Sequence, residues 1–149
     1  MPTLAALLET NRAAVVEDCL QILDAEVGDK SGLSGLAIKA GFAAVKSVKP
    51  GFLREAVLEL LPEFAAALEP LYQDARSRNV PVGEHFLSNR PRVAQALLAI
   101  TDAKARGVPS GVVKSAYERL RGAAERNVEA AVPRLARLVS TWSARAGGH

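Results

Sequence analysis

Two stretches of the chain repeat each other, and this repeat constrains the fold more than any other feature of the sequence. Residues 11–25 and 89–103 are identical at seven of fifteen positions, at a constant offset of 78, where unrelated segments would share about one. Helical periodicity alone would produce apolar matches, but not matching polar residues in the same order. The identical pairs are Asn11 and Asn89, Arg12 and Arg90, Val15 and Val93, Leu20 and Leu98, Ile22 and Ile100, Asp24 and Asp102, and Ala25 and Ala103.

The match continues beyond these segments, with the offset shrinking in the loops. Ser34-Gly35 corresponds to Ser110-Gly111, and the surroundings of Pro62 correspond to those of Pro133. Three short helices bury little apolar surface by themselves, so stacked repeats must share a core. The sequence therefore predicts an all-α protein with one helical domain over residues 1–149. In it, two pseudo-symmetric three-helix repeats, at about 4–72 and about 82–142, share one core.

Local signals indicate where the helices begin and end. Asn11 and Asn89 are of a residue type that caps helix N-termini. Ser110 should open one helix, and the apolar positions from Val128 to Trp142 should belong to the next. The apolar seam of the third helix keeps its phase across Pro62, which predicts a kinked or restarted helix that holds its direction. The positions of that seam are Val57, Leu61, Phe64, Leu68 and Leu71.

Several runs of the sequence resemble one known family. These are the runs from Lys30 to Ala40 and from Phe42 to Gly51, together with Leu98 to Ala103 and Tyr117 to Arg121. They are similar to a family of small bacterial proteins classified only as a domain of unknown function. The resemblance covers about residues 11–138 and implies a helical fold. It supplies no activity, substrate or site.

One turn has the composition of a weak anion site. It precedes a helix N-terminus, whose backbone N–H groups can hold an anion; the alternative is an ordinary turn and cap. A Walker phosphate loop is excluded, because Asp29 stands where the glycine before the lysine is required. The candidate residues are Lys30, Ser31, Gly32, Ser34 and Gly35.

No other pattern indicates a catalytic, cofactor or metal site. Glutamates recur at a four-residue spacing at Glu55, Glu59 and Glu63, but no Glu-x-x-His partner accompanies them. The single cysteine, Cys19, lies in an apolar run and is interpreted as a buried thiol that acts as a small hydrophobe.

Asp24 and Asp102 each lie near the C-terminal end of a predicted helix, where the helix dipole disfavours a carboxylate. An aspartate at that position in both repeats should therefore have a cationic or N–H partner. If the first long helices pack antiparallel, Arg12 would meet Asp102 and Arg90 would meet Asp24 as structural pairs. The alternative is that each aspartate binds the following turn, at Ser31–Ser34 or at Ser110.

Charge is unevenly distributed along the chain. Residues 1–75 hold six basic and eleven acidic residues, whereas residues 76–149 hold thirteen basic and five acidic ones. Either the two halves compensate each other, or the second half presents a cationic surface to nucleic acid, anionic lipid or an acidic protein.

The function predicted from these features is a non-enzymatic helical module that binds a protein partner or a ligand. The alternative is a cationic binder of nucleic acid or another polyanion through the Arg-rich second repeat. An apolar cleft between the repeats with convergent polar groups would instead favour small-molecule binding or catalysis. The chain shows no signal peptide and no stretch apolar enough to span a bilayer, which predicts a cytoplasmic protein.

Overall fold

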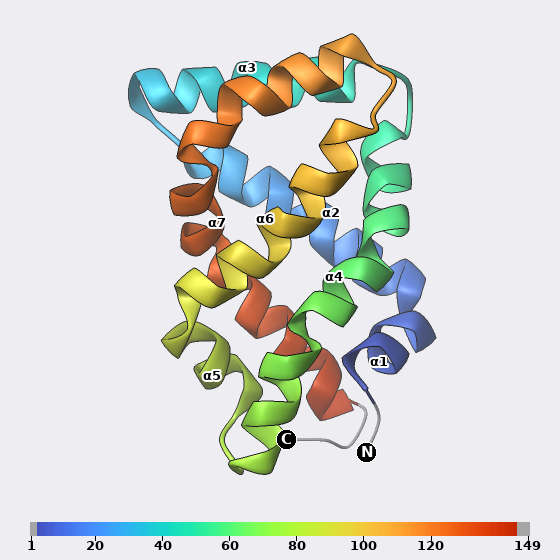
Figure 1. The fold of residues 1–149 in the computed structure, drawn as a ribbon, viewed down its shortest axis with the longest axis vertical. Coiled ribbons are helices and arrows are strands. Elements are labelled where there is room, and N and C mark those ends of the chain that lie inside the picture. The colour runs from blue at the N-terminus through green and yellow to red at the C-terminus, as the bar shows by residue number, and fades with distance from the viewer. Residues whose placement is uncertain (1–2, 146–149) are drawn as a thin grey trace.

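The computed structural model describes residues 3–145, apart from the side chain of Ser34, and this part of the chain folds into seven helices without a strand (Figure 1). The prediction of an all-α fold is therefore confirmed. In chain order the helices are α1 (Leu4–Thr10), α2 (Arg12–Asp29), α3 (Gly32–Lys46), α4 (Phe52–Ser77), α5 (Val82–Ser88), α6 (Arg90–Arg106) and α7 (Gly111–Arg145).

The short helices α1 and α5 both end at an asparagine. Asn11 Nδ2 donates to the Leu7 carbonyl at 2.9 Å, and Asn89 Nδ2 donates to the His85 carbonyl at 2.8 Å. Neither side chain makes the predicted N-cap hydrogen bond to the next helix. The N-cap prediction is wrong in this respect, because each side chain closes the helix before it.

The long helices run through their prolines. α4 is continuous through Pro62 and Pro70, as its apolar seam predicts, and α7 is continuous through Pro133. Proline removes one helical hydrogen bond and crowds the preceding turn, and both helices bend in Figure 1. The separate helices predicted after Ser110 are one helix, because the second half has no counterpart of the Pro50-Gly51 turn between α3 and α4.

The buried core lies at the end of the molecule where α1 and α5 meet the C-terminal parts of α4 and α7 (Figure 1). Tyr72, Phe86 and Val132 are almost completely buried there. At Gly83 a Cβ would meet Ser140 Oγ and stand 3.2 Å from the Ala136 carbonyl oxygen, so α5 and α7 approach each other closely at this position. This end provides the tightly packed support for the rest of the fold.

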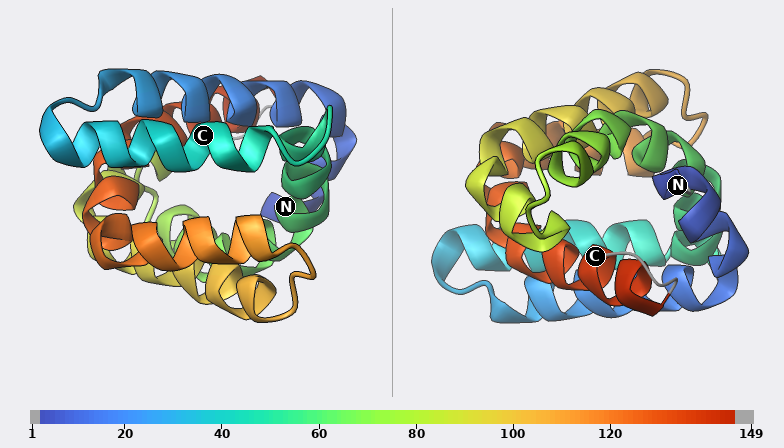
Figure 2. Two further views of the ribbon diagram at one scale, coloured as in Figure 1. Left: turned by 90° about the horizontal axis from the view of Figure 1, so that it is seen from above. Right: turned by 90° about the horizontal axis from the view of Figure 1, so that it is seen from below.

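The opposite end is built differently. α3 and the first half of α7 lie across it side by side (Figures 1 and 2), and a Cβ at Gly41 would stand 2.8 Å from Leu120 Cδ1. α3 contributes no described side chain to the buried core, and its Leu33 and Leu36 are 87% and 64% exposed. The described apolar side chains of α3 are therefore exposed or half-buried.

None of the helices within residues 3–145 combines the length and the hydropathy that a membrane crossing needs.

Candidate functional site

An apolar cavity of about 380 Å³ lies among α2, α4, α6 and α7, with Leu4 and Leu8 of α1 and Ile38 of α3 also in its lining. From above, α2 and α3 run along one side of this region, and α6 and the first half of α7 run along the other (Figure 2). The cavity thus separates the first half of the chain from the second. Its volume lies within the range of about 300–1,000 Å³ that is typical of small-molecule sites.

The lining of the cavity is almost entirely apolar. All but five of its side chains are Leu, Ile, Val, Ala or Phe, and the exceptions are Cys19, Glu26, Lys30, Thr101 and Asn127. Many of the apolar side chains, such as Ile22, Leu97 and Leu135, are only partly buried although they pack against the core. They retain exposed surface at positions that line the cavity.

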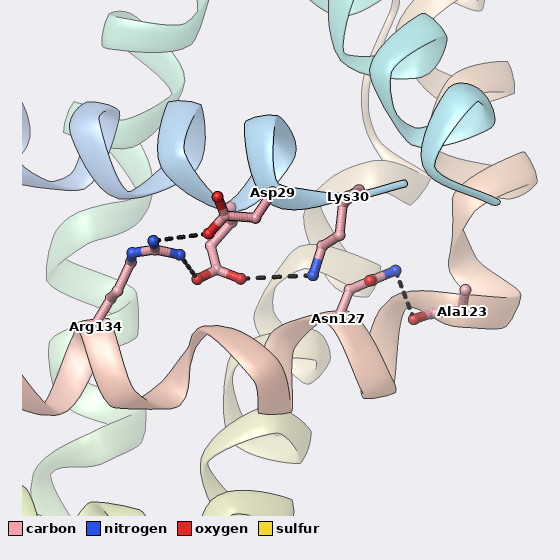
Figure 3. Close-up of polar contacts among 6 residues, drawn as sticks. Asp29, Lys30, Ala123, Asn127 and Arg134 are labelled. Carbon is pink, nitrogen blue, oxygen red and sulfur yellow. Dashed lines mark hydrogen bonds and ion pairs between the residues drawn. The ribbon is translucent and has the colours of Figure 1, made fainter. Parts of the chain in front are cut away.

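Charged side chains gather at the end of the cavity where α2 stops (Figure 3). Arg134 of α7 binds Glu26 and also binds Asp29, with Nη2 at 2.8 Å from Oδ2. Hydrogen bonds to Asp29 and to Glu26 raise the pKa of Arg134, so this guanidinium holds its charge. The contact ties α2 to α7 and gives the cavity one polar end.

Lys30 and Asn127 are the remaining polar residues of that end. Lys30 Nζ lies 3.6 Å from Glu26 Oε1, and the two side chains are 19% and 13% exposed. Asn127 Nδ2 donates one hydrogen bond to the Ala123 carbonyl at 2.9 Å. A lysine ammonium and a side-chain amide therefore line this end of the cavity together with the carboxylate of Glu26, and Figure 3 shows how Lys30 and Asn127 lie.

Cys19 lines the cavity from α2. Burial, and in second place the charge of Asp18, raise the pKa of its thiol to about 11. The thiol is therefore protonated at neutral pH and weak as a nucleophile. It provides a chemical reporter inside the cavity.

The turn predicted to hold an anion sits beside this polar end. Ser31 precedes α3 without a side-chain cap, Gly32 has a positive φ of 72°, and Gly35 is packed so that a Cβ would stand 2.7 Å from the Lys30 carbonyl carbon. The side chain of Ser34 lies outside the described residues. Of the four candidates whose side chains the structure describes, only Lys30 lines the cavity.

Asp102 binds residues of the following helix. Arg121 Nε and Nη2 donate to its two carboxylate oxygens at 2.8 and 3.0 Å, and Tyr117 Oη donates to Oδ1. Asp24 has a weaker, exposed counterpart, with Lys46 Nζ at 4.0 Å. These contacts correct the pairs inferred from the sequence, Arg12 with Asp102 and Arg90 with Asp24.

The reason is helix placement. Within residues 3–145, no Cα atom of α2 lies within 8 Å of a Cα atom of α6, so the close antiparallel packing that the predicted pairs assumed is absent. Arg12 reaches Glu9 and the Leu58 carbonyl instead. The requirement for a cationic partner holds for both aspartates, but the partner is a residue of the next helix in the same half.

Charges of the two halves meet at several points. Arg134 binds Glu26 and Asp29, and Lys104 Nζ lies 2.8 Å from Glu63 Oε2 and 3.7 Å from Glu59 Oε1. The acidic first half and the basic second half therefore neutralise part of each other's field. Within residues 3–145, no group of three His, Cys, Asp or Glu side chains is placed to hold a metal ion.

Sequence reasoning missed the cavity because its lining residues have the same composition and period as core residues. Lys30 and Asn127 are polar residues beside apolar helix stripes, and this could have indicated a polar end of a cavity. The sequence does not show that α2 and α7 bring these two residues together.

Comparisons with known proteins give a family and no relative of known activity. No curated protein and no solved structure is significantly similar to the chain. A family model described as a family of unknown function, DUF6918, matches residues 4–143. With nearly the whole chain covered by that match, this protein belongs to the DUF6918 family.

Proposed function

We propose that the protein is a non-enzymatic binding protein for a small apolar or amphipathic molecule, which occupies the cavity between the two halves. The observation that carries the proposal is a cavity of about 380 Å³ with an apolar lining and polar side chains gathered at one end. Pockets that bind small molecules combine mostly apolar walls with a few placed polar groups.

The lining of the cavity adds an energetic argument. Covering apolar surface gains about 25 cal/mol for each Å² removed from water. Side chains of the lining such as Ile22, Leu97 and Leu135 keep exposed apolar surface, so an apolar occupant that covers them gains free energy. Phe86 and Val132 are almost completely buried and do not line the cavity, so the fold keeps a packed core beside it.

The test is a titration with a neutral apolar probe, dodecanol, followed by thermal unfolding and by alkylation of Cys19. Ligand binding to the folded state raises stability by about 2.7 kcal/mol at a hundredfold excess over Kd, and an occupant should slow Cys19 alkylation because Cys19 lines the cavity. If dodecanol, dodecanoate and the dye Nile red all leave both the unfolding temperature and the alkylation rate unchanged, the proposal is wrong.

We also propose that the two halves arose by duplication and form pseudo-symmetric repeats. The same short helix, ending at an asparagine with the same hydrogen bond, starts each half. The same aspartate then pairs with the matching cation, Lys46 or Arg121, of the following helix. A cytoplasmic location and a bacterial source stay predictions from the sequence.

One observation favours the second candidate, a polyanion binder. A surface groove of about 500 Å³ between α2 and the end of α7 is lined by Arg134, Arg137 and Arg145 beside Trp142. Arg134 in this groove already binds two carboxylates, which weakens the case. Polyanion binding should fall steeply with salt, and no binding of single-stranded or duplex nucleic acid at micromolar protein and low salt would rule this candidate out.

A further inference from the structure

The polar side chains of the cavity give it a direction. Glu26, Lys30 and Asn127 meet at the end where α2 stops (Figure 3). The fourth polar residue, Thr101, bonds within the protein, since its hydroxyl lies 3.2 Å from the Leu98 carbonyl and 2.8 Å from Tyr117 Oη. A ligand that fills the cavity therefore meets polar groups at one end and apolar side chains over the rest of its length.

The hydrogen-bonding groups at that end indicate which kind of ligand headgroup can bind there. Each carboxylate has a cation: Glu26 binds Arg134 and faces Lys30, and Asp29 binds Arg134. The Lys30 ammonium has no carboxylate oxygen within hydrogen-bonding distance, because the nearest one, Glu26 Oε1, is 3.6 Å away. The Lys30 side chain is also only 19% exposed, which limits its hydrogen bonding to water. Asn127 uses one of its two amide hydrogens on the Ala123 carbonyl. The Lys30 ammonium and one N–H of Asn127 can therefore donate hydrogen bonds to a ligand, and the matching ligand headgroup is a hydrogen-bond acceptor.

We propose that the ligand is a long-chain carboxylate, with its headgroup at Lys30 and Asn127 and its alkyl chain in the apolar part of the cavity. This inference rests on the proposed function. A carboxylate accepts hydrogen bonds only and is strongest when it accepts them from a cation. Glu26 and Asp29 stand close by, so a singly charged headgroup fits this end better than a doubly charged phosphate.

The test compares two ligands of equal chain length by isothermal calorimetry. Dodecanoate should bind wild-type protein about tenfold more tightly than dodecanol, the factor expected for one hydrogen bond to a charged group. Lys30→Met should remove that advantage and leave dodecanol binding unchanged. Lys39→Met is the matched control, because Lys39 is exposed on α3 and does not line the cavity. Lys30→Arg should restore most of the preference for the carboxylate.

The outcomes separate this inference from the proposed function. Equal affinity of the wild type for dodecanoate and dodecanol would overturn the carboxylate assignment while leaving the apolar binding function standing. The same holds if Lys30→Met and Lys39→Met lower dodecanoate affinity equally. Failure of both ligands to bind the wild type, with no uptake of Nile red, would reject the binding function itself. The wild-type comparison decides the inference even if a variant does not fold.

Discussion

Filling the cavity from its wall is the sharpest test of its existence, and Ala131→Phe does this. Ala131 lies on α7, is half-buried and lines the cavity. A cavity of about 150 Å³ walled by aliphatic and aromatic residues accepts a benzene molecule, so a phenyl ring should use less than half of the available volume here. Burying a phenylalanine side chain is worth about 1.5–3 kcal/mol. We therefore expect a free energy of unfolding that is unchanged or raised by up to about 2 kcal/mol.

The assay is urea unfolding, in which a change of midpoint at constant slope reports a change of stability. Ala130→Phe is the matched control, because Ala130 is the preceding residue on the same helix but is exposed. It should change stability by no more than about 0.5 kcal/mol. Ala131→Phe should also weaken dodecanol binding, whereas Ala130→Phe should not.

Close packing would give the opposite result. Inserting a large side chain into a well-packed core costs about 1–3 kcal/mol. A loss of that size in Ala131→Phe, with Ala130→Phe neutral, would show that the space is filled by protein side chains and would refute the cavity.

Three further predictions concern stability. Phe86→Ala in the packed end should cost about 3–5 kcal/mol, whereas Leu97→Ala at the half-buried cavity wall should cost less; equal losses in urea unfolding would contradict this division of the fold. Tyr117→Phe should cost about 1 kcal/mol, because it removes the hydroxyl between Thr101 and Asp102, and no change in the unfolding midpoint would count against that network. The hydrogen bond from Arg121 lowers the pKa of Asp102, so the carboxylate contributes its full stabilisation above its unfolded pKa of about 4 and loses it as the pH falls through the lower folded pKa. In Asp102→Asn, the free energy of unfolding should therefore depend less steeply on pH in the acid range. An unchanged pH dependence in that range would refute the assignment.

Helix identity could be predicted from the sequence because its causes are local. The apolar seam through Val57, Leu61 and Phe64 keeps its phase across Pro62, and α4 is continuous there. The same reasoning placed a break in the second half where α7 runs on. A shared pattern predicts shared helices, but a deleted turn between two helical segments lets them fuse, and the turn residues Pro50 and Gly51 have no counterpart there.

The sequence predicts that Asp24 and Asp102 each have a cationic or N–H partner, but it does not identify which residue that partner is. The helix dipole requires a cation or an N–H donor near each carboxylate, and each has a cation. Which cation it is depends on the angle between neighbouring helices. Lys46 and Arg121 occupy corresponding positions of the two halves, 75 residues apart. An antiparallel contact between the first long helices would favour Arg12 equally well on sequence grounds.

The cavity could not be predicted because burial and cavity lining use the same residues. Leu120 on α7 and Ile38 on α3 continue ordinary apolar helix stripes, and nothing in their spacing tells whether the opposing helix is in contact or held apart. In the structure, α3 approaches α7 closely where Gly41 meets Leu120, and Arg134 joins α7 to α2 through Glu26 and Asp29. The apolar pattern indicates neither contact.

The protein combines a packed core with a cavity because different contacts stabilise different parts of the fold. α1 and α5 are too short to be stable alone, yet they pack with α4 and α7 into the end that buries Tyr72, Phe86 and Trp142. The other end is joined by polar contacts: Asp102 with Arg121 links α6 to α7, and Arg134 with Glu26 and Asp29 links α7 to α2. These polar contacts join the helices beside the apolar contact of Gly41 with Leu120. Under the proposed function, an apolar ligand would add packing at the cavity walls, whereas Phe86, which does not line the cavity, would stay buried with or without it.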